Sequence, residues 1–264
     1  MKPLAQWPAD YRRRLCGVLT DIDDTLTTHG RITPEVLHAL ARLRAAGLNL
    51  VAVTGRPTYW AMPLLRLCGF DAVIAENGAS AFWLDDGGRL CSWFYADEPT
   101  RKEHRRRLEA FVPELRRRFP GIAVADDAPQ RIGDLAFDIG ENITPLPASQ
   151  VEEVVAFIRA HGFFATASSI HAHASLVRFC KQTTSAHVLA DVFGFDDATA
   201  RAGFAFVGDS GNDARMFAHY PHAVGVANVA AHVAMLEKAP AYVTNAPYGA
   251  GFVEFADAIL AARG

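Results

Sequence analysis

Residues 16–27 have the sequence Cys16-Gly17-Val18-Leu19-Thr20-Asp21-Ile22-Asp23-Asp24-Thr25-Leu26-Thr27, an apolar run followed by carboxylates and hydroxyls. Such a run is typical of a buried strand in a parallel sheet. Open sheets of this kind bind ligands beyond the carboxyl ends of their strands, which is where Asp21 and Asp23 would lie. If the strand continued through both residues, their carboxylates would point the same way and repel unless a cation lay nearby. The stretch therefore predicts a metal site or an acid/base pair.

The residues that follow predict further strands and helices of the same sheet. Thr33 and Pro34 are typical of the N-cap and first residue of a helix, and Gly47 is typical of its end. Pro57 disfavours helical geometry at the residue before it, so a loop is expected there. The predicted order is a helix over 33–47, a strand over 48–53, the loop Thr54-Gly55-Arg56-Pro57, a helix interrupted at Pro63, and a strand over 72–75.

The pattern changes near residue 82, where antiparallel pairing replaces the alternation of strands and helices. Two apolar segments flank Asp85-Asp86-Gly87-Gly88, a turn sequence that predicts a hairpin. An apolar stripe predicts a helix over 100–119, and Pro113 predicts a kink in it or two short helices. Together with the segments that follow, this region predicts a small α+β domain. Its strands are expected at 82–84, 90–94, 122–125, 135–139, 163–167 and 175–179, and a second helix at 148–161.

From Lys181 the alternation returns and completes the first sheet. The expected elements are a helix to about Phe193, a strand over 204–207, the loop Gly208-Asp209-Ser210-Gly211-Asn212-Asp213, a helix from Ala214, and strands at 224–226 and 241–243. We therefore predict an α/β fold, a doubly wound and mostly parallel sheet with an inserted α+β domain. The predicted core comprises residues 1–84 and 181–264, and the inserted domain comprises residues 85–180.

The composition indicates a globular protein, because half of the 264 residues are hydrophobic. A net charge of −3 gives no general attraction to nucleic acid. Four widely spaced cysteines suggest neither a zinc site nor a disulfide framework, and fit a reducing compartment. Asp21 ends the first apolar stretch too early for a signal peptide, and no later segment is long enough to span a bilayer. We expect a cytoplasmic protein that binds neither nucleic acid nor membrane, and its oligomeric state stays open.

Polar side chains stand at four predicted strand or helix ends, so one pocket could hold them all. A carboxylate nucleophile can approach a negatively charged phosphoryl group only if Mg²⁺ and a lysine neutralise the site. Asp21 and Asp209 supply the hard oxygen ligands that Mg²⁺ prefers, and Thr54 with nearby amides could hold the phosphoryl oxygens. The four positions are Asp21 with Asp23, Thr54, Lys181, and Asp209 with Asn212 and Asp213.

Four motifs of this chain resemble those of the haloacid dehalogenase superfamily. They are Asp21-Ile-Asp23-Asp-Thr-Leu-Thr, Val-Thr54-Gly-Arg, an isolated Lys181, and Gly-Asp209-Ser-Gly-Asn-Asp213. With a domain inserted after Glu76-Asn77-Gly78-Ala79, the chain is most similar to the Cof-like branch. That branch includes sucrose-phosphatase-like, trehalose-phosphate-phosphatase-like and archaeal phosphoglycolate-phosphatase-like enzymes, so the resemblance implies a mobile α/β cap. The chain departs from the pattern at Asp24, where many relatives carry Gly, and after Lys181, where Gln replaces a common Gly.

The resemblance also implies a role for each site residue. Asp21 would be the nucleophile that forms an aspartyl phosphate, and Asp23 would protonate the leaving group and then activate water. The carboxylates of Asp21 and Asp209 and the carbonyl of Asp23 would bind Mg²⁺. The remaining residues would bind the phosphoryl group or orient ligands, waters and the lysine: Thr54, Gly55, Lys181, Asn212 and Asp213.

The expected function is a Mg²⁺-dependent phosphatase acting on a sugar phosphate or a phosphoglycolate-like monoester. A phosphosugar mutase of the same superfamily stays open, as does a non-catalytic module that binds a phosphorylated ligand or nucleic acid. The arginine-rich helix over 101–118 favours a solvated helix face over a nucleic acid contact. His171 and His173 have no third ligand at a suitable spacing, which favours partly buried or surface histidines over a zinc site. One of them could contact the substrate.

Overall fold

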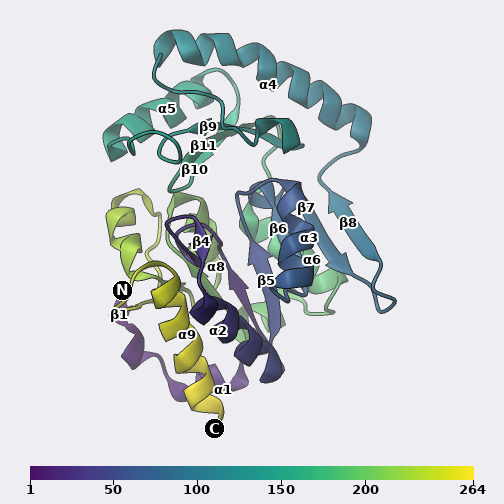
Figure 1. Cartoon of the computed structure of the whole chain (residues 1–264), viewed down its shortest axis with the longest axis vertical. Helices are drawn as coiled ribbons and strands as arrows, with labels where there is room; N and C mark the ends of the chain where they lie inside the picture. Colours follow the sequence, from purple (N-terminus) through teal and green to yellow (C-terminus); the bar gives the residue numbers. More distant parts are fainter.

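The computed structural model describes residues 1–264 except for the side chain of Met235, and it contains a large sheet with a smaller sheet above it (Figure 1). The large sheet has nine strands in the order β1-β14-β13-β12-β2-β5-β6-β7-β8; β6–β7 and β7–β8 pair antiparallel, and the other neighbours pair parallel. This confirms the predicted doubly wound, mostly parallel sheet. Its strands are β1 (Lys2–Pro3), β2 (Gly17–Thr20), β5 (Asn49–Val53), β6 (Ala72–Ala75), β7 (Ser80–Leu84), β8 (Leu90–Phe94), β12 (Phe204–Gly208), β13 (Val224–Gly225) and β14 (Tyr242–Val243).

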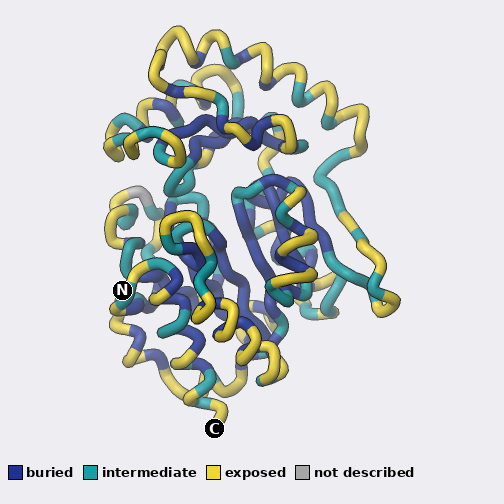
Figure 2. The backbone as a smooth tube through the Cα atoms, in the orientation of Figure 1, coloured by how far each residue is buried: buried dark blue, intermediate teal, exposed yellow. Residues whose placement is uncertain are grey.

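Helices cover both faces of the large sheet, and two apolar cores result. One core joins the sheet to α2, α3 and α9, and the other joins it to α6, α7 and α8. The buried strands between exposed helix surfaces are visible in Figure 2. Burial on both faces explains why these strands are continuous apolar runs. The helices are α1 (Ala9–Arg14), α2 (Pro34–Ala45), α3 (Ala61–Leu67), α6 (Lys181–Asp191), α7 (Asp197–Gly203), α8 (Ala214–His219) and α9 (Tyr248–Arg263), and a small hairpin β3 (Thr27–Thr28) and β4 (Arg31–Ile32) follows β2.

The smaller sheet belongs to the inserted region and has its own apolar core. Its three strands pair antiparallel in the order β10-β11-β9, with Ala172 opposite Phe137 and Ala167. Two helices cover the side of this sheet that faces away from the large sheet (Figure 1). The open side therefore faces the carboxyl ends of the core strands. The elements are α4 (Glu98–Arg118), β9 (Asp134–Asp138), α5 (Ala148–Ala160), β10 (Phe164–Ala167) and β11 (His171–Ser175).

Two local predictions were wrong, and one of the two alternatives for Pro113 is excluded. Residues 122–125 form only a single bridge, from Val124 to Phe137, because the chain enters a 3-10 helix at Ala128. The strand expected at 175–179 lies instead at 171–175, where alternating small residues and histidines pair with β9. Pro113 does not divide α4: it lies on the exposed side of one continuous helix, where water can satisfy the carbonyl that loses its partner.

The division into core and inserted domain stays a prediction, and we propose that its first boundary lies after β8. β8 pairs with β7 along its whole length, with Ala81 opposite Trp93, so a boundary after residue 84 would cut a hairpin of the large sheet. We call residues 95–180 the cap. In the described part of the chain, no helix combines the length and apolarity needed to cross a membrane. All four cysteines are free thiols.

Candidate active site

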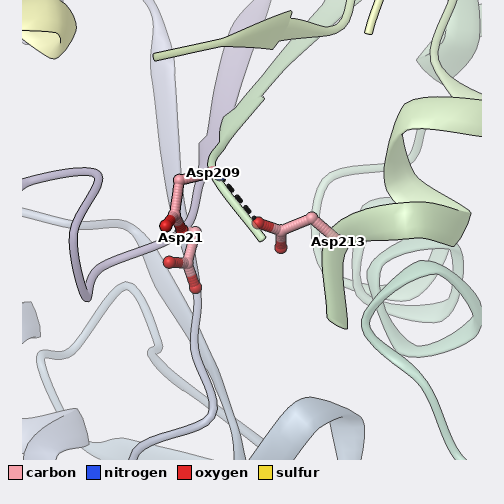
Figure 3. Close-up of side chains that lie close together, drawn as sticks. All are labelled: Asp21, Asp209 and Asp213. Atoms are coloured by element: carbon pink, nitrogen blue, oxygen red, sulfur yellow. Dashed lines mark hydrogen bonds between the residues drawn. The ribbon is translucent and has the colours of Figure 1, made fainter. Parts of the chain in front are cut away.

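Three carboxylates meet at the carboxyl end of the large sheet (Figure 3). Asp21 follows β2 and Asp209 follows the neighbouring strand β12, so parallel pairing brings them side by side. The N–H of Asp21 donates to the carbonyl of Val207 at 2.9 Å, which extends the strand pairing to the site. Asp213 adds a carboxylate from the turn after β12, and oxygens of all three buried residues lie within 4.8 Å of one another. The structure thus places the two carboxylates expected to bind metal together.

Lys181 is the cation of this cluster. It is the first residue of α6, and its side chain is completely buried. Its Nζ donates to Asp21 Oδ1 and, at 2.8 Å, to Asp213 Oδ1. The other oxygen of Asp213 accepts from the backbone N–H groups of Asp209 at 3.0 Å and Ser210 at 3.2 Å. Asp213 therefore fixes both the lysine and the turn that carries Asp209, which fits the orienting role implied for it.

The electrostatics of this cluster favour an additional cation. Three carboxylates and one ammonium group leave a formal charge of −2 in a buried space. Burial, against the opposing charge of Lys181 and together with the charges of Asp213 and Asp23, raises the pKa of Asp21 to about 8. Burial and the charges of Asp21 and Asp213 also hold the pKa of Asp209 well above its usual range. A divalent ion would relieve this repulsion.

Asp21 and Asp209 are the residues that fit such an ion best. Hard divalent cations such as Mg²⁺ prefer carboxylate oxygens together with water and phosphate oxygens. Asp209 receives only two longer contacts, from Thr25 Oγ1 at 3.4 Å and Asn228 Nδ2 at 3.2 Å. Both oxygens of Asp213, in contrast, already accept hydrogen bonds. We therefore assign the metal to Asp21 and Asp209 as a proposal and leave Asp213 as their support.

The loop after β5 brings Thr54 and Gly55 to the same end of the sheet. Thr54 is buried, its N–H donates to the carbonyl of Ile74 at 2.8 Å, and its Oγ1 accepts from the N–H of Arg56 at 3.0 Å. Gly55 lines the cavity next to Asp21, and its carbonyl accepts from Arg131 of the cap at 2.9 Å. Gly55 thus lies at the cavity itself and Thr54 directly before it, and their contact with a phosphoryl group stays a prediction.

Asp23 belongs to a chain of ion pairs that runs from the core into the cap. Arg56 donates to both oxygens of Asp23 at 2.8–3.0 Å and to Glu141 Oε1 at 2.7 Å. The second oxygen of Glu141 contacts Nε2 of His171 at 2.8 Å. Bidentate arginine contacts are among the stronger ones in proteins, so Asp23 has a fixed position at the edge of the cavity. Asp24 beside it has a φ of 54°, the conformation that explains why Gly is common there.

Asn212 lines the cavity from the core side. Its Nδ2 donates to Asn77 Oδ1 at 2.9 Å, which links the turn after β12 to the turn after β6. The cavity holds only about 10 Å³, roughly the space of one water molecule. Cap residues 168–171 and 173 form its other wall, so the cap and the core enclose this cavity together.

Sequence reasoning missed three residues of this site. Arg56 was part of a quoted motif but received no role, although its position in Val-Thr-Gly-Arg was a usable signal. Glu141 follows β9 in a turn in which the carboxylate of Asp138 accepts three backbone N–H bonds at 2.8–2.9 Å. Asn77 lies in a turn with a φ of 55°. No motif marks Glu141, because its role depends on how the cap rests on the core, and Asn77 was quoted only in the stretch before the inserted domain.

The basic helix α4 lies away from this site, on the outer side of the cap (Figures 1 and 2). Four of its basic residues form ion pairs one turn apart within the helix, for example Lys102 with Glu98 at 2.6 Å and Arg106 with Glu103 at 2.8 Å. Such pairs are typical of a solvated helix. They reduce the positive charge that would be available to nucleic acid. That nucleic acid is not a partner of this protein stays a prediction.

Known proteins resemble this chain in sequence and in fold. A family model described as haloacid dehalogenase-like hydrolase matches residues 18–95. A phosphoglycolate phosphatase from Pyrobaculum neutrophilum is 31% identical over 93% of this chain and 96% of its own length. A phosphoglycolate phosphatase from Haloarcula marismortui is 29% identical over 90% of this chain and 94% of its own length.

Solved structures support the same fold. A protein from Thermoplasma acidophilum matches with a TM-score of 0.67 and 18% identity, covering 93% of this chain and 98% of that chain. The sucrose-phosphatase of Synechocystis, in complex with sucrose and phosphate, matches with a TM-score of 0.63 and 16% identity, covering 94% and 98%. Taken with the relative that matches almost end to end, these similarities show that the chain belongs to the haloacid dehalogenase superfamily, as a phosphatase of its Cof-like branch.

Proposed function

We propose that this phosphatase hydrolyses a small phosphate monoester, a sugar phosphate or a phosphoglycolate-like ester, through an aspartyl phosphate on Asp21. The observation that carries the proposal is the buried contact of Asp21 with Lys181 beside Asp209. Lys181 holds one oxygen of the nucleophile and offsets charge in a space from which water is largely excluded. The names of the two sequence relatives support the ester class.

In the first step, a carboxylate oxygen of Asp21 bonds to phosphorus while the ester P–O bond breaks. Asp23 gives a proton to the departing alcohol oxygen. In the second step, Asp23 takes a proton from a water molecule that attacks phosphorus, and the bond to Asp21 breaks to release phosphate. Arg56 holds Asp23 in place for both proton transfers. When bound to Asp21 and Asp209, Mg²⁺ would supply charge neutralisation at the phosphoryl oxygens.

The test is phosphate release from sugar phosphates, phosphoglycolate and nucleotides, with and without Mg²⁺. We expect release that needs Mg²⁺ and that falls by about 10³-fold or more in Asp21→Asn, because the nucleophile is lost. Asp86→Asn, an exposed carboxylate in the β7–β8 turn, is the matched control and should retain full activity. Phosphate release that survives Asp21→Asn would contradict the mechanism, and an isomerised product without phosphate would indicate a mutase.

A further inference from the structure

The cap carries a second group of buried charges, which we call the cap cluster: Asp127, Arg131, Asp134 and His173. Arg131 is fully buried and donates two bonds to Asp127, at 2.7 and 2.8 Å, and one to Asp134 Oδ1 at 3.0 Å. The second oxygen of Asp134 contacts Nδ1 of His173 at 2.8 Å. The side chain of His173 is 4% exposed. Three charged residues thus fix the orientation of one imidazole ring.

This arrangement also fixes where the proton of His173 lies. Burial alone would raise the pKa of Asp134, but Arg131 and His173 hold it well below its usual range, so the carboxylate is ionised and can only accept. Burial lowers the pKa of His173 against the attraction of Asp134, which favours a neutral ring. The single proton then belongs on Nδ1, where it donates to Asp134. Nε2 presents a lone pair.

Nε2 of His173 is buried and has no hydrogen-bond partner, although it lines the cavity that contains Asp21 and Asp23. Asn77 Nδ2, a donor, is equally buried and unpartnered. Both atoms lie 3.4 Å from the point where a Cβ on Gly55 would stand, so both pack against the backbone of Gly55, which lines the cavity. A buried polar atom without a partner is costly, so the free acceptor on His173, a residue of the cavity wall, indicates a ligand group that can donate to it. A hydroxyl group has that capacity, because it donates and accepts.

The charges around the cavity argue against a carboxylate in the same place. Among the described residues that line it, Arg56 is the permanent cation, and Asp23 and Glu141 already occupy its guanidinium group. A ligand carboxylate would face the lone pair of His173 Nε2 with no free positive charge near it. The free acceptor on His173 and the lack of a free cation both favour a hydroxyl group next to the ester.

We propose that His173 is a specificity residue whose Nε2 accepts a hydrogen bond from a hydroxyl group on the alcohol part of the substrate. This inference rests on the proposed function and narrows its substrate class to monoesters of polyols or sugars. Asp134 acts as a positioning residue, because it keeps the free lone pair of the ring directed at the cavity.

Three two-carbon esters test the proposal, since they differ in one group: ethyl phosphate, 2-hydroxyethyl phosphate and phosphoglycolate. For the wild type with Mg²⁺, we expect kcat/KM for 2-hydroxyethyl phosphate to exceed that for each of the other two by about tenfold, the value of one hydrogen bond. In His173→Phe the preference for 2-hydroxyethyl phosphate over ethyl phosphate should fall to about one. His173→Gln, which keeps an acceptor near the Nε2 position, should restore part of the preference.

His38→Gln, an exposed histidine on α2, is the matched control and should leave all three values unchanged. A wild type that prefers phosphoglycolate, or a hydroxyl preference that survives His173→Phe, would overturn the inference. An equal loss on all three esters in both His173 variants would show a purely structural role and would also overturn it. If His173→Phe does not fold, the wild-type ratio and His173→Gln still decide. Turnover without hydroxyl preference overturns this inference alone, whereas no phosphate release from any ester overturns the proposed function as well.

Discussion

Two buried charge clusters lie on either side of the same cavity, and they are balanced in opposite ways. In the core, Asp21, Asp209 and Asp213 share one lysine, which leaves a formal charge of −2 and raised pKa values at Asp21 and Asp209. In the cap cluster, Arg131 is bonded to two carboxylates, and the pKa of Asp134 is lowered.

The difference shows which cluster is built to receive a ligand charge and which is built to hold the structure. Excess negative charge in the core opposes folding until a cation arrives, because buried like charges repel. The paired charges of the cap cluster support the fold and satisfy one another, and only His173 Nε2 stays free. Equal substitutions in the two clusters should therefore change stability in opposite directions.

The largest expected effect is in the cap cluster. Asp134→Asn leaves Arg131 and His173 facing an amide that can no longer accept from both, and breaking such a buried pair costs about 3 kcal/mol. Asp209→Asn should leave the free energy of unfolding unchanged or raise it, since a repelled carboxylate is removed. Both are measured by urea denaturation at pH 7 with EDTA.

Asp86→Asn controls for the change of a surface carboxylate, and its unfolding midpoint should not move. Equal destabilisation in Asp134→Asn and Asp209→Asn would mean that the two clusters do not differ in the way their charges indicate.

The second largest expected effect is that of Mg²⁺ on the free energy of unfolding, which should depend on the core cluster and not on the cap cluster. An ion that binds only the folded protein stabilises it by about 2.7 kcal/mol when present at 100 times its dissociation constant. We expect a rise of this size in the free energy of unfolding of the wild type, and removal of the ion with EDTA should abolish it. The rise should be lost in Asp209→Asn and kept in Asp134→Asn, provided the latter still folds. A gain that is unaltered in Asp209→Asn would place the ion elsewhere.

The core side of the site could be predicted from the sequence because most of its residues follow a recognisable strand, whereas Lys181 begins a helix. Asp21 and Asp209 follow apolar runs whose parallel pairing fixes where the strands end. Thr54 is positioned by β5 in the same way. Local sequence thus determined both the fold and the location of these side chains.

The cap side could not be predicted, because its residues gain their roles from contacts between distant segments. Glu141, which contacts His171 within the cap, meets Arg56 only where the cap rests on the core. Glu76 was quoted only in the stretch before the inserted domain, yet it is buried with a φ of 49° and accepts backbone N–H bonds from Ile132 and Gly133 of the cap at 2.7–3.0 Å. No periodicity or motif predicts a contact of this kind between cap and core. The strand shifted from 175–179 to 171–175 shows the same limit, since only pairing with β9 set its register.

The smallest expected effect is a pH dependence of the free energy of unfolding, which arises from the ion pairs of Glu141 between cap and core. His171 and Arg56 lower the pKa of Glu141 to about 2 from its ordinary value of 4.5, so the ionised form is favoured in the folded protein. Its stabilisation is therefore complete above pH 4.5 and is lost as the pH falls toward 2. Because Glu141 is 25% exposed, we expect a contribution of about 1–2 kcal/mol after solvent screening.

The difference in free energy of unfolding between wild type and Glu141→Gln should be largest above pH 4.5 and should shrink toward pH 2. Glu152→Gln, an exposed residue on α5, should show no such difference, and a constant difference for Glu141→Gln would show that its charge does not hold the cap.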